Sequence, residues 1–496
     1  MKLKDNFTLL NISFYTSVFS LLLFLLLRLL LVYSYASDIG GVENNVIYSV
    51  AKVLAGGTLY DNPETNNFNI TQYSPLYYYT VIITTKLLKL NPISDLHAIY
   101  IIGRYYSLLF NLISVYLIYR LLTKKFYVEK KLALIAGIIY FIHLTRIHFA
   151  ARPDALFGLI FILIIFCFVK YFQENSKNKI VFVLGLLLIV ISIYIKQTGI
   201  QFLVIIPAYF FFIKKFKSFF ISLILLFVFG ALLYGAFNLI YNSYFFSNTV
   251  GGINNGVSIA RIYDVFSHFF LKYQVLFILG LIVSAQFFDK KQNLEIRFIA
   301  FVSIGVFCFA FVTSMKEGSW INYYNEFIIA TIILSAVMFE RISKTTNLSD
   351  NSHQFAKIVC TVFIVILLPN VVLQKLYHEH FQHLQESSSL YKNKQNVATF
   401  LESRLLSNQY FLSFDDQINA MLPLNSVVPN KDLVPSQSKF NYQNFTNSFN
   451  IGKIRFIVKY SGSAIANFMG CDFSNFKEIY KDENFTIYES NLLILH

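Results

Sequence analysis

The stretch VYSYASDIGGVENNVIYSVAKVLAGGTLYDN, residues 32–62, decides the fold. It overlaps the end of SVFSLLLFLLLRLLLVY, residues 17–33, which is the main part of the apolar segment 9–34. About 20 such residues cross the ~30 Å hydrocarbon layer of a membrane as a helix. Two acids, Asp38 and Glu43, stand directly beyond this exit from the bilayer. Ionisable groups at a membrane boundary are costly unless they are solvated or paired, so these acids are candidates for a function.

The composition of the whole chain is that of a membrane protein. Of its 496 residues, 56% are hydrophobic and 14% are charged, and the mean hydropathy is +0.56. A soluble protein carries roughly 25% charged residues. The net charge of +14 lies mostly in short loops between apolar runs, where it sets orientation, so no nucleic-acid partner is expected.

Eleven apolar segments predict a polytopic α-helical membrane protein with about 11–13 transmembrane helices. The first is retained as a span and not cleaved, because its apolar run is too long for a signal peptide. The predicted spans are 9–34, 99–122, 132–149, 155–173, 179–195, 199–213, 218–241, 269–288, 297–314, 326–342 and 356–377.

Basic clusters predict the orientation of these spans. They fall in every second loop, and such loops face the cytoplasm by the positive-inside rule. The clusters are KKFYVEKK (124–131), KNK (177–179), KKFK (214–217), DKKQNLEIR (289–297) and RISK (341–344). The protein is therefore expected in the plasma (inner) membrane, with its N-terminus cytoplasmic and its C-terminal part extracytoplasmic.

Two segments of the first outer loop, residues 35–98, are expected to form helices on the membrane surface. SPLYYYTVIITTKLLKL, residues 74–90, is apolar enough to span, but a crossing there would turn every later basic loop outward. Residues 43–55 carry an apolar stripe at helical spacing, and Gly56 and Gly57 end it.

The chain divides by composition into a transmembrane part, residues 1–377, and a polar tail, residues 378–496. In the tail, NVATFLESRLL predicts a helix, QYFLSF and GKIRFIVKY predict buried strands, and FKEIYKDENFTIYES predicts two strands around a turn. This alternation predicts a small soluble α/β domain outside the membrane.

The outward loops carry carboxylates together with cations. The candidates for the chemistry are Asp38 and Asp154, and those for a phosphate site are Arg152, Lys196, Lys316 and Tyr323; Glu43 and Asp61 are candidates to support an acceptor or a metal. Transfer from a lipid-linked phosphate needs a carboxylate as general base for the attacking hydroxyl and cations for the leaving phosphate. This set of groups beside lipid-embedded helices fits that reaction.

Each candidate also has a purely structural interpretation. Asp38 stands before two glycines, where Asp is common in turns and caps. Asp154 stands in the first turn of a predicted helix, favoured by the helix dipole, and Arg152 is close enough to pair with it. Lys196 and Lys316 are also typical of interfacial anchors, and Tyr323 of the aromatic belt.

Six short motifs, in order, resemble those of the GT-C glycosyltransferases that use polyprenyl-phosphate sugars. The resemblance is to the bacterial aminoarabinose transferases of lipid A and the protein O-mannosyltransferases, glycosyltransferase families 83 and 39, and covers roughly residues 10–345. The motifs are SDIGG (37–41), LAGGTLYDN (54–62), YSPLYYY (73–79), ARPDAL (151–156), KQTG (196–199) and GSWINYYNE (318–326).

The resemblance implies a membrane glycosyltransferase with a polyprenyl-phosphate sugar donor and a glycan, glycolipid or protein acceptor. It implies that Asp38 is the catalytic base and that Asp154 supports the base or the acceptor. Displacement of the lipid phosphate in one step predicts an inverted configuration of the sugar. This chain departs from the family in two places. Asp38 is followed by Ile39, where many relatives have a second acid, and Tyr73 and Ser74 replace an acidic–basic pair.

Two other functions fit parts of the pattern. A transporter or flippase of a lipid-linked saccharide would carry charges at the membrane midplane and inverted repeats, and the chain shows no repeat. A receptor would use the tail alone. No metal-ligand spacing is present, although a divalent cation between Asp38 and Asp154 is compatible with the sequence, since hard cations take oxygen ligands.

Overall fold

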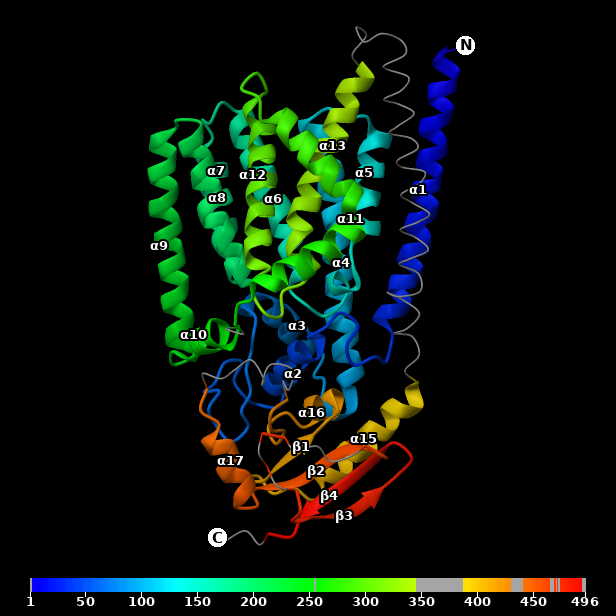
Figure 1. The fold of residues 1–496 in the computed structure, drawn as a ribbon, viewed down its shortest axis with the longest axis vertical. Coiled ribbons are helices and arrows are strands. Elements are labelled where there is room, and N and C mark those ends of the chain that lie inside the picture. Colours follow the sequence, from blue (N-terminus) through cyan, green and yellow to red (C-terminus); the bar gives the residue numbers. More distant parts are fainter. Residues whose placement is uncertain are drawn as a thin grey trace.

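The computed structural model describes residues 2–253, 256–344, 387–429, 440–463, 468–469, 471 and 473–492. Figure 1 shows a bundle of long helices with a small sheet-containing unit, the tail, at one end. The described chain begins at the end of the bundle away from the tail. The expected boundary between residues 377 and 378 falls outside the described residues.

Among the described residues, ten helices form the bundle, and each overlaps one of the predicted spans; the eleventh predicted span, 356–377, lies outside the described residues. By length and composition, α1, α4, α6, α9, α11 and α12 are able to cross a membrane, and α7 and α8 are apolar but shorter. The helices are α1 (Lys2–Val32), α4 (Pro92–Lys125), α5 (Lys130–His143), α6 (Asp154–Gln173), α7 (Lys179–Ile193), α8 (Ile200–Phe212), α9 (Phe216–Ile240), α11 (Ile259–Phe287), α12 (Leu294–Thr313) and α13 (Asn325–Lys344).

Two predicted spans have the wrong bounds. The span was expected over 132–149, but helix α5 ends at His143, and the short 3-10 helix η1 (Arg146–His148) follows it. The span expected over 269–288 belongs to a longer helix that begins at Ile259 and is kinked at Tyr273 (φ −128°, ψ 19°). Polar residues in the first part of α11 lowered its hydropathy, so the apolar pattern did not reveal that part.

Short helices lie between the bundle and the tail: α2 (Glu43–Leu54), α3 (Pro75–Leu87) and α10 (Tyr244–Thr249). Pro75 starts α3 at the first helical position, where its fixed φ suits a helix. As predicted, α3 lies outside the bundle, and it exposes Ile83 and Leu87, which suits a membrane surface. The surface position predicted for 43–55 is wrong, because α2 is buried along most of its length between α3, α4 and the tail.

The tail is a four-stranded sheet with helices on both faces, in the order β1-β2-β4-β3. Strands β1 and β2 are parallel, and the other two pairs are antiparallel. Its elements are α15 (Ser388–Glu402), β1 (Tyr410–Ser413), α16 (Asp416–Met421), α17 (Gln443–Asn450), β2 (Ile454–Tyr460), β3 (Phe476–Lys481) and β4 (Phe485–Ser490). The predicted helix, strands and hairpin are confirmed.

Side chains alternate between the two faces of the central strand β2, as the pleat requires. Phe456 and Val458 join the core formed with α15 and α16, and Ile457 joins the core formed with α17. Helix α16 packs against both α2 and α4, so the tail contacts the first outer loop and the bundle together. Figure 1 shows α16 directly beside α2.

Candidate active site

The candidate residues come from the ends of different bundle helices on the side that faces the tail. Asp38 lies in the first acidic loop (residues 33–42), between α1 and α2. The second acidic loop (residues 149–154) ends at Asp154, which is also the first residue of α6. Lys196 lies between α7 and the 3-10 helix η2 (Gln197–Gly199), and Lys316 lies just after α12. Because successive helices run in opposite directions, residues as far apart as Asp38 and Lys316 lie at the same end of the bundle.

Asp154 is buried, and its carboxylate accepts three hydrogen bonds. Lys196 Nζ and Asn322 Nδ2 each donate to Oδ1 over 2.7 Å, and Arg152 Nε donates to Oδ2 over 3.1 Å. Asn322 belongs to the 3-10 helix η4 (Ile321–Tyr324). Three separate segments thus meet at one carboxylate. Its place in the first turn of α6 and its pairing with Arg152 confirm the structural interpretation of this residue.

Arg152 joins the two acidic loops. Its Nη1 donates to the carbonyl oxygens of Gly40, over 2.8 Å, and Gly41, and its Nη2 donates to Tyr73 Oη over 2.9 Å. The loops also touch directly, because a side-chain carbon on Gly40 would lie 2.5 Å from Ala150 Cβ. Only glycine permits this approach. The guanidinium therefore contacts the Asp154 carboxylate and the main chain beside Asp38 together.

Glu43 and Arg104 form a fully buried ion pair behind the first acidic loop. Arg104 donates from Nε to Glu43 Oε1 over 2.8 Å and from Nη2 to Oε2 over 2.9 Å. The same carboxylate accepts from the amides of Ile39 (2.9 Å) and Ala151 (2.7 Å). The Glu43 carboxylate thus accepts from four donor groups and holds both acidic loops. Its role is therefore structural, and it is not available to contact an acceptor substrate.

Asp38 is half-buried. Its Oδ1 accepts from the amide of Gly40 over 2.9 Å, so the interpretation of this aspartate as a turn residue is confirmed. Burial, followed by the charge of Glu43, raises the pKa of Asp38 to about 6, against the opposing effect of Arg152 and the Gly40 and Gly41 amides. A carboxyl with a pKa near 6 is a stronger base than an ordinary aspartate.

Lys316 carries a positive charge without a paired carboxylate. In the described part of the chain, no acid lies within ion-pair distance of its ammonium group. Burial, together with the charge of Lys196, lowers the pKa of Lys316 to about 8. Lys196 Nζ lies 5.3 Å from the centre of the Tyr323 ring. In this cation cluster, Arg152 and Lys196 thus pair with Asp154, and Lys316 adds a third cation that is free to pair with an anion placed beside it.

Asp61 takes no part in this group of contacts. Lys52 Nζ donates to Asp61 Oδ1 over 3.0 Å and to Asn69 Oδ1 over 3.0 Å. The Lys52 side chain is 3% exposed and that of Asp61 is 35% exposed. These bonds join the end of α2 to the following loop, which is a local structural function.

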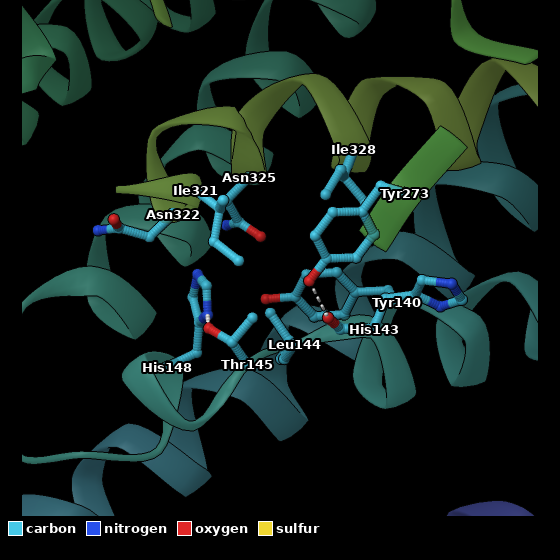
Figure 2. A pocket seen from close by; sticks show the side chains of 10 residues that line it. All are labelled: Tyr140, His143, Leu144, Thr145, His148, Tyr273, Ile321, Asn322, Asn325 and Ile328. Atoms are coloured by element: carbon cyan, nitrogen blue, oxygen red, sulfur yellow. Dashed lines mark hydrogen bonds between the residues drawn. The ribbon is translucent and has the colours of Figure 1, made fainter. Parts of the chain in front are cut away.

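A small pocket adjoins the cluster inside the bundle. Figure 2 shows Asn325 and the hydroxyl of Tyr140 pointing into the pocket, whereas the amide of Asn322 points away from it. The lining residues are Tyr140, His143, Leu144, Thr145, His148, Tyr273, Ile321, Asn322, Asn325 and Ile328. Asn322 lines the pocket and also donates to Asp154, so the pocket and the cluster share a wall.

The donor set around Asp154 does not fit a bridging divalent cation. Both of its carboxylate oxygens already accept from cations or an amide. Among the described residues, no group of three or more His, Cys, Asp or Glu side chains is placed to hold a metal ion.

The site candidates from the sequence omitted three residues that the structure brings in: Asn322, Tyr73 and Arg104. Asn322 stands in the quoted motif GSWINYYNE, but an amide is not ionisable and gave no charge signal. Tyr73 occupies the position where the chain departs from the GT-C pattern, and it receives a hydrogen bond from Arg152. Arg104 lies within an apolar run, and its partner Glu43 is 61 residues away.

No protein-family model matches the sequence, and no curated protein matches it significantly. Among solved structures, ArnT from Cupriavidus metallidurans bound to undecaprenyl phosphate is similar, with a TM-score of 0.61 at 11% identity over 95% of this chain and 97% of that chain. The oligosaccharyltransferase AglB from Archaeoglobus fulgidus, in complex with an inhibitory peptide and a dolichol-phosphate, has a TM-score of 0.57 at 12% identity over 92% and 70%. ArnT, an aminoarabinose transferase, and AglB are both GT-C glycosyltransferases. The chain therefore has the GT-C membrane fold that its ordered motifs predicted.

Proposed function

We propose that this protein is an integral-membrane glycosyltransferase that transfers a sugar from a polyprenyl-phosphate donor to an acceptor at the outer face of the membrane. One observation carries the proposal: Asp38, a half-buried aspartate with a raised pKa, is joined through Arg152 to the cation cluster of Arg152, Lys196 and Lys316. A base for a hydroxyl and a site for a departing phosphate are the two groups that this transfer needs.

The reaction is a single displacement at the anomeric carbon. The acceptor hydroxyl gives its proton to Asp38, and its oxygen forms the new bond to the anomeric carbon. The bond between that carbon and the phosphate oxygen breaks, and polyprenyl phosphate leaves with the electron pair. Attack opposite the leaving group inverts the configuration of the sugar.

The remaining residues hold this geometry. Lys316 and Lys196 stabilise the charge that develops on the phosphate, and Tyr323 packs beside Lys196. Asp154 keeps Lys196 and Arg152 in place through its hydrogen bonds. The sugar and the acceptor, whether glycan, glycolipid or protein, are set by surfaces beyond these contacts.

The donor class is supported by the structural neighbours. ArnT was solved bound to undecaprenyl phosphate, and AglB was solved with a dolichol-phosphate. Both ligands combine one phosphate with a long isoprenoid chain. The cation cluster at the end of an apolar bundle suits the same combination, because the phosphate and the chain need solvents of opposite polarity.

The test uses the purified full-length protein in lipid nanodiscs and a panel of radiolabelled polyprenyl-phosphate sugars, with a mixture of envelope glycolipids as acceptors. We expect release of lipid phosphate and labelled product from one donor. D38N should lower the rate by about 10²–10⁴-fold, the usual contribution of a general base. D289N, at an exposed acid between α11 and α12, should transfer at the wild-type rate. Full turnover by D38N would refute the base assignment, and donor crossing sealed vesicles without cleavage would favour a transporter.

A further inference from the structure

The first acidic loop is held from two opposite directions. On the bundle side, Arg104 donates to the carbonyl oxygens of Ser34 and Ala36, each over 2.7 Å, and Glu43 accepts from the amide of Ile39 over 2.9 Å. These bonds fix the main chain on both sides of Asp38. The bundle alone does not account for all the contacts of the loop, however, because its two ends also meet the tail.

Consecutive residues of α16 bind the two ends of the segment that contains Asp38. Gln417 Nε2 donates to the carbonyl oxygen of Tyr35 over 3.0 Å. Asn44 Nδ2 donates to Asp416 Oδ2 over 2.5 Å. Residues 35–44 are therefore attached at each end to one short helix that lies more than 370 residues later in the chain.

A buried network fixes the orientation of Gln417 itself. Its Oε1 accepts from Lys394 Nζ over 2.9 Å, and its side chain is buried. Lys394 also pairs with Asp415 over 3.0 Å, and Asp415 Oδ1 accepts from the amides of Gln417 and Ile418 at the start of α16. The amide group of Gln417 thus has one orientation, in which its NH₂ points at Tyr35.

The ring of Tyr35 is held by the same part of the tail. It stacks on His97 with ring centres 4.0 Å apart and planes at 12°, and it lies 5.4 Å from Tyr391. The hydroxyl of Tyr391 accepts from the amide of His97 over 2.9 Å. Both the main chain and the side chain of Tyr35, three residues before Asp38, are thus bound by the tail or by residues that the tail touches.

We infer that the tail positions the first acidic loop, and that Gln417 is the positioning residue through which the tail fixes Asp38. The inference rests on the proposed function, since it takes Asp38 as the base. It gives the tail a part in turnover that is independent of any acceptor it binds. Displacement of a reacting group by about 1 Å costs on the order of 10²-fold in rate, so loss of one such bond is measurable.

The experiment compares Q417M with Q395M in the full-length protein. Gln395 is a matched control, because its Nε2 also donates from the tail to main-chain carbonyls of the first outer loop, those of Ile93 and Ser94. We expect Q417M to lower kcat about tenfold with the donor KM within about twofold, and to speed hydrogen exchange in the peptide 35–44 several-fold. Q395M should change neither.

Two further measurements keep the inference open to refutation. N44A removes the hydrogen bond from Asn44 to Asp416 without changing any residue of the tail, and it should speed hydrogen exchange in the peptide 35–44. Equal turnover and equal exchange in Q417M and Q395M would overturn the inference, as would a parallel loss in both. If the wild type transfers no sugar from any donor, the proposed function fails, whereas the exchange comparison still decides whether α16 holds the loop.

Discussion

Arg152 shows how one side chain sets the geometry of this site. Its planar guanidinium makes bonds in three directions: to Asp154, to the carbonyls of Gly40 and Gly41, and to Tyr73. A lysine at this position keeps the charge but not the fork, so it cannot make these contacts together. The convergence of the two acidic loops therefore depends on the shape of this cation as well as on its sign.

The pKa values of Asp38 and Lys316 predict a bell-shaped pH dependence. Asp38 must lose its proton to act as a base, so kcat/KM should rise as the pH increases through about 6. Lys316 must keep its proton to bind phosphate, so kcat/KM should fall above about 8. Initial rates at low donor concentration between pH 5 and 9.5 provide the measurement. A flat profile across pH 6 would exclude Asp38 as the titrating base.

Replacement of Lys316 tests the phosphate site. K316M removes a charged donor, and a hydrogen bond to a charged group contributes about 1.5–3 kcal/mol. The KM for the donor should therefore rise about 10–100-fold, and K316R should recover part of the loss. K86M, at an exposed lysine in the last turn of α3, is the control and should bind the donor as the wild type does. Unchanged donor affinity in K316M would place the phosphate elsewhere.

Among the elements, α2 carries the buried carboxylate that joins the two loops. E43Q leaves Arg104 fully buried opposite a neutral amide, and breaking a buried ion pair costs about 3–5 kcal/mol. The free energy of unfolding should fall by roughly that amount, as measured by denaturant unfolding in detergent. E129Q, at an exposed acid before α5, should leave it within about 0.5 kcal/mol. Wild-type stability in E43Q would show that the pair is not buried in the membrane-bound protein.

The burial of α2 also marks a limit of sequence reasoning at this scale. The apolar stripe of residues 43–55 predicted a helix, and the helix is present where expected. Its polar face was expected to meet water because periodicity reports one helix at a time. The cover over that face is α16, which lies more than 360 residues later, and no local pattern specifies that contact.

For the whole molecule, hydropathy and charge predicted most of the fold. Each span depends on a property of about 20 consecutive residues, so ten of the eleven could be located before the structure was known. The grouping of the charged candidates was predictable: Asp38, Arg152, Asp154, Lys196 and Lys316 were selected by their charges in loops expected on one side, and they lie at one end of the bundle. The partners of these groups were not, because the pairing of Glu43 with Arg104 and of Asp154 with Asn322 depends on contacts far apart in the chain.

The predicted orientation can be tested with single cysteines in a cysteine-free background. K89C, in the first outer loop, and K477C, in β3, should react with a membrane-impermeant maleimide in intact spheroplasts. K124C, in the last turn of α4, and K290C, between α11 and α12, should react only after permeabilisation. All four lysines are exposed in the structure, so accessibility differs only by side. Labelling of K89C and K477C from opposite sides would contradict both the orientation and the docking of the tail.

The attachment of α16 to both ends of the Asp38 segment has a consequence for biosynthesis. The ribosome makes the bundle helices first, and the residues that bind Tyr35 and Asn44 emerge only after more than 400 residues have been joined. A nascent or truncated chain can insert its helices while its base is still unsupported. Under the proposed function, competence for turnover would then arrive last, once the tail has folded against the first outer loop, so that an unfinished protein would not consume a lipid donor.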